Sequence, residues 1–268
     1  MVLKRKIKLK KIICVLVLTA LLPVALMVGC GSSNPSPSAP VGPTTTYTPA
    51  PYTTPQATPQ AAVVLNTSAN YVILSYTGIT NSGPSTTCGG YGVYPDGQTS
   101  VTGSPAIVEV CGGLINVGNS AADTAKIDLS TAYTNAMGRS GGATLPPGAD
   151  IGGQTLYPGL YFETANLNIS SADLTLNGDG NINSIFIFQI KSNLIVGPGR
   201  HVILTNGAQA ANVFWAAAGY CSLNTTASMV GNIMTYTSVT LNTGAVLTGR
   251  ALAENGNVTL LTNTITHP

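Results

Sequence analysis

The sequence predicts a mainly β fold in which short strands stack into a solenoid, with one long α-helix packed alongside. The first observation is a repeat near the C-terminus, where Leu223, Leu241 and Leu260 follow one another at steps of 18 and 19 residues. Each repeat joins a short alternating strand to an Asn, Thr or Gly corner, and one such turn buries its apolar face only under the next turn. The second observation is that a convincing helical period occurs once, between residues 121 and 139.

Residues 1–30 are predicted to be a signal peptide. Six Lys and Arg residues precede an apolar run from Ile12 to Val28, and small residues close it at Gly29-Cys30. A Gly-Cys pair at this place resembles a bacterial lipobox, which implies that Cys30 is acylated after cleavage and anchors the protein to the cell envelope, at the outer membrane in a bacterium with two membranes. The alternative is an uncleaved membrane anchor, but the run is short against the roughly 20 residues that a spanning helix needs.

Residues 31–60 are rich in Ser, Pro and Thr without apolar periodicity, which predicts a disordered tether. The block 61–268 is predicted to be one β-rich domain. Beyond the leader the chain carries five Lys and Arg against nine Asp and Glu, a net charge of −4. Five scattered cations form no basic stripe, so nucleic acid is not an expected partner. We expect a monomer that contacts the membrane only through its lipid anchor.

Three cysteines remain in the domain. Cys88 and Cys111 each begin a Cys-Gly-Gly sequence in a loop-like segment, and an envelope address favours oxidation, so a Cys88–Cys111 disulfide is expected. Cys221 falls on the inward phase of its strand and is expected to be a buried thiol. With two histidines in the chain and no Cys or acid spacing of the right kind, neither a metal nor another cofactor is expected.

The first part of the domain is predicted to be strand and then turns. Val72, Leu74 and Tyr76 alternate within residues 70–80, which indicates one or two strands, and Gly and Pro recur from 83 to 105. A helix is expected over 121–139, with Ser120 as its N-cap. Its apolar stripe consists of small residues together with one leucine: Ala121, Ala125, Leu129, Ala132 and Ala136.

From residue 156 to the end the sequence predicts strands. A turn at 156–161 leads to strands at 172–176, 184–190, 193–196, 201–204 and 212–216, followed by the repeats. Residues 185–188, Ile-Phe-Ile-Phe, are apolar throughout, which is typical of a strand covered on both faces. We expect the helix to supply the second cover.

Four motifs in this part of the chain resemble the ice-binding-like family of bacteria and fungi. They are Leu156-x-Pro158-Gly159-x-Tyr161, Ile187-Phe188-Gln189-Ile190, the segment from Gly207 to Trp215, and Gly249-Arg250-Ala251-Leu252-Ala253. The resemblance covers nearly all of 61–268. It implies a right-handed β-solenoid of triangular section with the helix beside it, and N-terminal strands that join the stack although they are remote in sequence. It also implies a flat face that adsorbs to ice.

The alternation of the repeats assigns side chains to the two faces of each strand. With the leucines inward, the outward pairs are Tyr220/Ser222, Ser238/Thr240 and Asn257/Thr259. The ice-binding face of the family carries a Thr, small, any, Thr/Asn pattern, which the residues at 237–240 nearly match and those at 99–102 repeat. The predicted ice-binding face therefore comprises Ser100, Thr102, Ser222, Thr237, Ser238, Thr240, Asn257 and Thr259.

Threonine suits such a face because its methyl orders water, its hydroxyl anchors water, and its branched Cβ restricts the rotamers. Extending the outward columns upstream through Leu194 and Leu176 adds Lys191/Asn193 and Asp173/Thr175. Lys191 and Tyr220 are expected to interrupt the plane. The structural alternative is that Thr and Asn are present because they suit strands and corners. Corner positions are expected for Thr225, Thr243, Thr262 and Asn263.

Catalysis is not expected. Solenoid hydrolases and lyases need clustered carboxylates or a cationic base, whereas Asp179 of the closest acid pair, Asp173 and Asp179, lies in an Asn-Gly-Asp-Gly turn. Two non-catalytic functions remain. One is adsorption to ice or ordered water. The other is a structural or adhesive surface module, for example one that binds glycans, in which exposed tyrosines such as Tyr220 and Tyr236 would supply the stacking rings.

Overall fold

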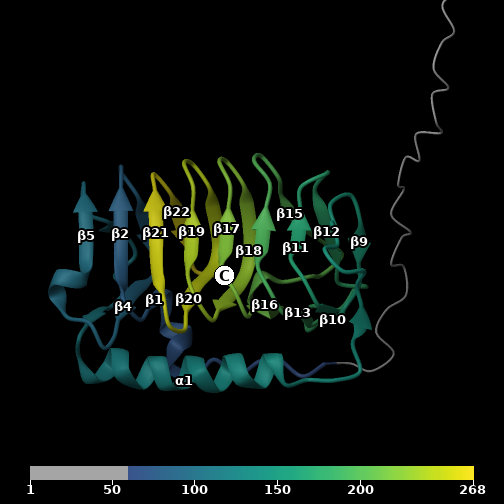
Figure 1. Cartoon of the computed structure of the whole chain (residues 1–268), viewed down its shortest axis with the longest axis horizontal. Coiled ribbons are helices and arrows are strands. Elements are labelled where there is room, and N and C mark those ends of the chain that lie inside the picture. The colour runs from purple at the N-terminus through teal and green to yellow at the C-terminus, as the bar shows by residue number, and fades with distance from the viewer. Residues whose placement is uncertain (1–59) are drawn as a thin grey trace, which may run out of the picture. The chain divides into compact units, whose positions relative to one another are not determined.

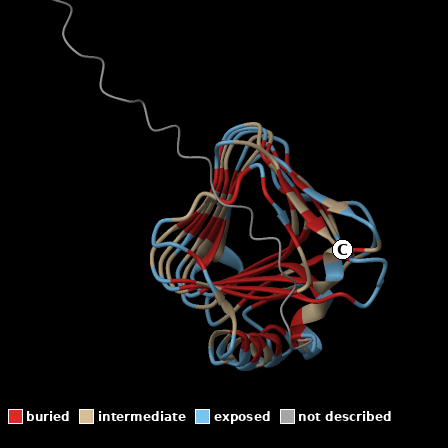
Figure 2. Ribbon diagram, turned by 90° about the vertical axis from the view of Figure 1, so that its right-hand side faces the viewer, coloured by how far each residue is buried: buried red, intermediate tan, exposed pale blue. Residues whose placement is uncertain are grey.

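The computed structural model describes residues 60–268. The predicted signal peptide with Cys30, and the tether apart from Gln60, lie outside the described residues and stay predictions. The described chain forms strands β1 to β22 and one α-helix, and every strand pairing is parallel. Viewed end-on, the strands make a three-sided solenoid filled by buried residues (Figure 2). The predicted fold class is confirmed.

Each side of the solenoid is a stack of short strands. The helix-covered side holds β8 (Ala143–Thr144), β10 (Gly159–Glu163), β13 (Phe186–Ile190), β16 (Val213–Ala217), the second halves of β18 (Ser228–Thr235) and β20 (Val246–Ala253), β1 (Tyr71–Ser75), β4 (Gly90–Val93) and β7 (Ile115–Val117). The next side is a seven-stranded sheet of β11 (Leu167–Ile169), β14 (Leu194–Val196), β17 (Cys221–Leu223), β19 (Val239–Leu241), β21 (Asn257–Leu261), β2 (Gly78–Ser82) and β5 (Val101–Ser104). The third side holds β9 (Thr155–Leu156), β12 (Leu174–Asn177), β15 (Val202–Thr205), the first halves of β18 and β20, β22 (Thr264–Thr266), β3 (Thr86–Cys88) and β6 (Val108–Glu109).

The chain does not fill this stack in sequence order. Strand β1 pairs with β20, β2 with β21 and β3 with β22, so the N-terminal coils lie beside the C-terminal one. The chain then runs through α1 (Ser120–Met137) along the length of the solenoid (Figure 1). From β8, at the far end, it adds one coil after another until β20 lies beside β1. The remote N-terminal strands therefore join the stack, as the family resemblance implies.

Helix α1 is close to the expected one, with two corrections. Its N-cap is Asn119, whose side chain accepts a hydrogen bond from the Ala122 N–H at 3.0 Å; the expected cap, Ser120, is the first helical residue. Ala122 rather than Ala121 is buried at the start of the stripe, and Ala125, Leu129, Ala132 and Ala136 follow it as expected. An 18-residue helix is about 27 Å long, which spans about six strands.

Two apolar layers lie on either side of the helix-covered sheet. Inside the solenoid, Tyr161, Phe188 and Trp215 occupy equivalent positions on β10, β13 and β16 and stack with ring centroids 5.2 and 3.9 Å apart. Outside it, Ile187 packs in a cluster with the small residues of α1. This double cover also corrects the prediction for β1, which is buried at all five positions instead of alternating, while Tyr76 lies beyond its end.

Buried cations fasten the helix and the N-terminal segment to the solenoid. The Lys126 Nζ donates hydrogen bonds to the carbonyls of Ala253 (2.6 Å) and Glu254 (2.7 Å). The Arg250 guanidinium donates to the Ala69 carbonyl and to the Asn232 Oδ1 at 2.6 Å. Burial lowers the pKa of Lys126 to about 8, although the nearby Glu254 carboxylate opposes the shift. These charges therefore serve the fold and are not available to a ligand.

The Lys126 environment predicts a pH-dependent stability. The unfolded chain holds this proton up to the ordinary pKa of 10.5, whereas the folded protein releases it near pH 8. Between these values the unfolded state binds more protons, so stability rises with pH. We expect the free energy of unfolding of the wild type, relative to that of Lys126→Met, to increase by about 1 kcal/mol per pH unit between pH 8 and 10. Denaturant titrations in which the two curves stay parallel would contradict this assignment.

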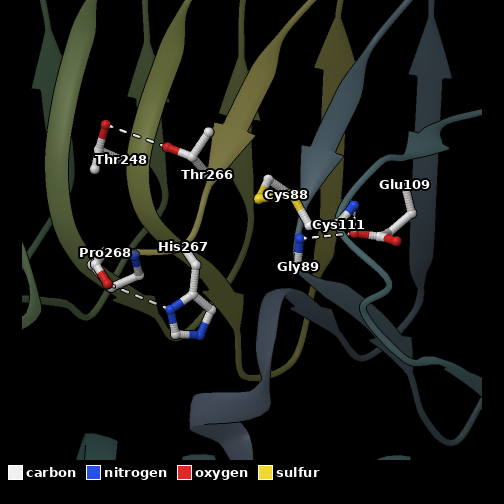
Figure 3. The surroundings of a disulfide bond; sticks show 8 residues. All are labelled: Cys88, Gly89, Glu109, Cys111, Thr248, Thr266, His267 and Pro268. Atoms are coloured by element: carbon white, nitrogen blue, oxygen red, sulfur yellow. Dashed lines mark hydrogen bonds between the residues drawn. A yellow bond between two sulfur atoms is a disulfide. The ribbon is translucent and has the colours of Figure 1, made fainter.

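Cys88 and Cys111 form the expected disulfide, with Cα atoms 4.8 Å apart, and Cys221 is a free, buried thiol. Figure 3 shows the surroundings of the bond, where the Glu109 carboxylate accepts hydrogen bonds from the N–H groups of Gly89 (3.0 Å) and Cys111 (2.9 Å). These bonds, that of Cys111 first, lower the pKa of Glu109. The disulfide and the carboxylate together secure the loop that ends the stack after β6.

Removing this disulfide is expected to destabilise the protein by about 3 kcal/mol, because the two cysteines are 23 residues apart and their link restricts the unfolded chain. The comparison is between the wild type and a Cys88→Ser/Cys111→Ser variant in denaturant melts. A reducing agent should lower the wild type to the level of the variant and leave the variant unchanged. Equal stability of both proteins without reductant would show that the loop is held by its other contacts.

Candidate functional site

The seven-stranded sheet presents one continuous column of outward side chains. The strands pair in a register that places Asn168, Ile195, Ser222, Thr240, Thr259, Thr80 and Thr102 side by side, one per strand. From β11 to β2 the residues that flank the column point inward and are buried; Cys221, Leu223, Val239, Leu241, Val258 and Leu260, for example, are fully buried. On the end strand β5, Val101 is half-buried and Gly103 is exposed. Four neighbouring strands, β19, β21, β2 and β5, thus carry threonine at the same position, and we call these seven residues the central column.

A second column lies two residues before the central one. Gly78 pairs with Asn257, and the registers on either side extend this row to Ser238, Tyr220 and Ser100. Thr237 lies at the margin, where its N–H donates to the Gly219 carbonyl. All eight residues predicted for the face therefore lie on this sheet or in the turns that enter it.

Two residues of the face were not predicted from the sequence. Thr77 and Thr80 are exposed, and Thr80 stands in the central column between Thr259 and Thr102. Their segment, Thr77-Gly78-Ile79-Thr80, fits the Thr, small, any, Thr pattern with glycine in the small position. The signal was present in the sequence. The interpretation of residues 70–80 as one or two strands, based on the alternation of Val72, Leu74 and Tyr76, did not single out this four-residue motif.

The upstream extension of the columns is wrong. Leu194 pairs with Cys221 instead of Leu223, so Ile195 occupies the central column. Lys191 lies at the turn after β13, with its Nζ 5.8 Å from the centroid of the Phe162 ring, and does not stand in the face. Asp173 and Thr175 belong with β12 on the third side, where Asp173 is 3.8 Å from Arg200. The coils that end in β12 and β15 are longer than the repeats, and this changes the phase.

The face is uncharged and partly ordered by its own hydrogen bonds. No Asp, Glu, Lys or Arg occurs within the seven strands. The Thr102 and Thr80 hydroxyls are 3.5 Å apart, and the Asn257 Nδ2 donates to the Thr259 Oγ1 at 3.0 Å. Tyr220, 42 % exposed, is the bulky side chain of the second column. From β17 to β5 the central column is a row of small polar side chains, and the Tyr220 ring lies near its β17 end.

The third side is also regular but differs in composition. Its outward columns mix threonines such as Thr264 and Thr86, whose hydroxyls are 3.4 Å apart, with exposed aliphatic side chains. Among these, Val246, Ile203 and Val108 are 38 %, 42 % and 53 % exposed. Of the two sides, only the seven-stranded sheet therefore carries threonine at the same position on four adjacent strands.

Other kinds of site find little support in residues 60–268. This part of the chain contains no group of three or more His, Cys, Asp or Glu side chains that could hold a metal ion. Within the same residues, α1 is not apolar enough to cross a membrane. Buried carboxylates such as Glu163 accept hydrogen bonds from backbone N–H groups of neighbouring turns, for example from Ala165 at 2.7 Å.

A solenoid with one helix along it and a threonine row on an uncovered side defines a class, and sequence comparison agrees with it. The model of the ice-binding-like family matches residues 73–266, and the chain belongs to this family. It is 35 % identical to an ice-binding protein of Flavobacterium frigoris (strain PS1) over 93 % of this chain and 96 % of the relative. It is 36 % identical to an ice-binding protein of a Colwellia species over 77 % of this chain and 84 % of the relative.

Solved structures show the same likeness. The crystal structure of an ice-binding protein from an Antarctic biological consortium superposes with a TM-score of 0.74 at 36 % identity, covering 80 % of this chain and 95 % of that one. An ice-binding protein from the Antarctic ascomycete Antarctomyces psychrotrophicus gives a TM-score of 0.71 at 28 % identity. The fold is therefore shared by bacterial and fungal proteins whose names report binding to ice.

Proposed function

We propose that this protein adsorbs to ice, without catalysis, through the outer face of the seven-stranded sheet. The observation that carries the proposal is the central column, in which Thr240, Thr259, Thr80 and Thr102 follow one another on adjacent parallel strands. Neighbouring threonines are then spaced by the strand repeat, roughly 4.7–4.9 Å. Such an array holds hydroxyl and methyl groups in a fixed period, which a water lattice can match.

Rigidity and lack of charge support this assignment. From β11 to β2 the residues beneath the column are buried, so the strands that carry Thr240, Thr259 and Thr80 are fixed by the core. The strand of Thr102, β5, ends the sheet, and its Val101 is half-buried against the core. Threonine has few rotamers to lose, and little conformational entropy opposes binding. A charged side chain would hold its own hydration shell, and the seven strands contain none. Each water contact is weak, so affinity depends on many contacts in register.

The decisive experiment is direct. The purified protein is added to a single ice crystal in a nanolitre osmometer, and the crystal shape and the gap between melting and freezing are recorded. Faceted crystals with a measurable gap are expected. Round crystals, together with exclusion of the protein from growing ice, would contradict the proposal and favour the adhesive-module alternative.

We further propose that the protein is exported and held at the cell envelope by an acylated Cys30. The basic start, the apolar run and Gly29-Cys30 support this, and the disulfide in the domain suits an oxidising compartment. Mass spectrometry of the N-terminal peptide from native cells is expected to show a lipid-modified cysteine at position 30. An unmodified N-terminus at another residue would contradict it.

A further inference from the structure

Exposed aromatic rings gather on one corner of the solenoid. In residues 60–268, the aromatic side chains that are at least two-fifths exposed are Tyr76 (40 %), Tyr220 (42 %) and Tyr236 (50 %). Each lies in a turn that leads from the helix-covered side into the seven-stranded sheet: between β1 and β2, between β16 and β17, and between β18 and β19. We call these three residues the tyrosine row. The columns of the seven-stranded sheet include Tyr220 but not Tyr76 or Tyr236.

The stacking of the coils fixes the spacing of the row. Strand β1 pairs with β20 and β20 pairs with β18, so Tyr76 and Tyr236 are two coils apart, about 9.5 Å along the solenoid. Tyr220 follows on the next coil, displaced toward the seven-stranded sheet. Helix α1 runs along the solenoid beside this corner (Figure 1). Tyr76 and Tyr236 are level with each other across the stack and Tyr220 stands off that line, so the row follows the long axis of the solenoid. A ligand that follows it must be extended and periodic.

Two of the rings are held in place from below. The Tyr236 ring leans on Tyr133 of α1, with centroids 6.2 Å apart at an angle of 38°. The Lys126 Nζ lies 5.6 Å from the centroid of the Tyr76 ring. Rings fixed in this way present flat apolar surface at a small entropic cost. The helix thus stiffens the row as well as covering the sheet.

Polar groups alternate with the rings. Thr77 and Thr237, both exposed, follow Tyr76 and Tyr236 directly in the chain. On the coil between them the strand registers place the half-buried Glu254 level with the two rings, and the exposed Asn255 follows it. The fully buried core of a protein interface is apolar and depleted of charged residues, whereas here polar side chains separate single rings. Rings separated by hydroxyl and amide groups match a sugar polymer, whose apolar ring faces alternate with hydroxyls. Tyrosine is suited to such an amphipathic contact because its apolar face carries a polar tip.

We propose that the tyrosine row binds an extended β-linked polysaccharide, with alternate sugar rings stacked on Tyr76 and Tyr236 and with Tyr220 extending the contact. Asn255, Thr77 and Thr237 hydrogen-bond to the sugar hydroxyls. This site shares Thr77, Thr237 and Tyr220 with the margin of the predicted ice-binding face, but it does not include the central column. It gives an envelope protein a second, carbohydrate ligand, so the two functions that the sequence leaves as alternatives coexist on different parts of one solenoid.

The test is co-sedimentation of the purified full-length protein with insoluble cellulose and with chitin. The wild type and a Tyr76→Phe/Tyr236→Phe variant, which keeps the rings, are expected to sediment with at least one of the polymers. A Tyr76→Ala/Tyr236→Ala variant is expected to bind that polymer at least about tenfold more weakly. Wild-type protein that stays in the supernatant with both polymers, or equal binding by the Ala and Phe variants, would overturn the proposal.

Two further arms separate this site from the ice face and from loss of folding. Thr240→Tyr should bind the polysaccharide like the wild type, and the double Ala variant should still shape ice if the wild type does. Because Tyr76 and Tyr236 contact the helix, Tyr220→Ala serves as the variant least linked to folding. Its binding is expected to fall about threefold to tenfold at an unchanged melting temperature. Unchanged binding would remove Tyr220 from the row and overturn that part of the proposal.

Discussion

Replacing Thr240 with tyrosine is expected to abolish ice shaping. Thr240 stands in the central column between Ser222 and Thr259, and a ring placed there would project above its neighbours and lift the protein from a flat lattice. The loss should be nearly complete because adsorption depends on many weak contacts made at once. The fold should not suffer, since a substitution at such a surface position usually changes stability by no more than about 0.5 kcal/mol. Crystal shape, the freezing gap and the melting temperature are measured together.

The matched control is Thr264→Tyr on the third side. Thr264 is an exposed threonine on strand β22, of the same chemistry but on another face. This variant is expected to shape ice like the wild type. If Thr240→Tyr retains full activity and Thr264→Tyr loses it, the ice-binding face is the third side of the solenoid and not the seven-stranded sheet that carries the central column.

Replacing Gly249 with alanine is expected to destabilise the protein by about 3 kcal/mol or more. Strands β18 and β20 each pass from the third side to the helix-covered side at a glycine, Gly231 and Gly249, which pair with each other. A Cβ added at Gly249 would lie 1.9 Å from the Gly231 carbonyl oxygen, and backbone would have to move. The free energy of unfolding in denaturant melts measures the cost.

Gly97→Ala provides the comparison. Gly97 has a φ of −90°, open to any residue, and an added Cβ there would meet no atom within 4 Å. Its effect is expected to stay within about 0.5 kcal/mol, or to stabilise slightly by restricting the unfolded chain. If Gly249→Ala lowers the free energy of unfolding no more than Gly97→Ala does, the backbone of β18 and β20 can move apart to admit a side chain. The close approach of these two strands then does not require glycine.

The sequence predicts the repetitive part of the fold well because each repeat contains its own alternating strand and its own corner residues. Leu223, Leu241 and Leu260 are inward where the alternation places them, and the helix lies one or two residues from its expected ends. Corner residues also follow local chemistry: Thr262 has a φ of 60°, and the Asn263 Oδ1 accepts a hydrogen bond from the Leu261 N–H. These features depend on neighbours within a few residues.

The rest of the site depends on contacts between coils, which local patterns do not encode. Leu194 follows the same alternation as the repeats, yet its coil is longer and its register with β17 moves it to another position. Strand β1 loses its alternation because α1 covers it from the far side. Thr80 enters the central column only because the N-terminal coils dock against β21. The sequence shows the four-residue motif that contains Thr80, but it does not show which strands pair with the strand that carries it.

The pairing of the first coil with the last has a consequence for how the protein reaches its folded state. Strand β1 finds its partner in β20, where Ile73 lies opposite Ala251, and β2 and β3 find theirs in β21 and β22. During synthesis from the N-terminus the chain therefore cannot build the stack coil by coil, because the first strands pair with strands that are synthesised last. Contacts of such long sequence separation close large loops and slow folding. A chain truncated before β20 would leave β1 and β2 with open edges, and these edges are the surface through which parallel strands aggregate.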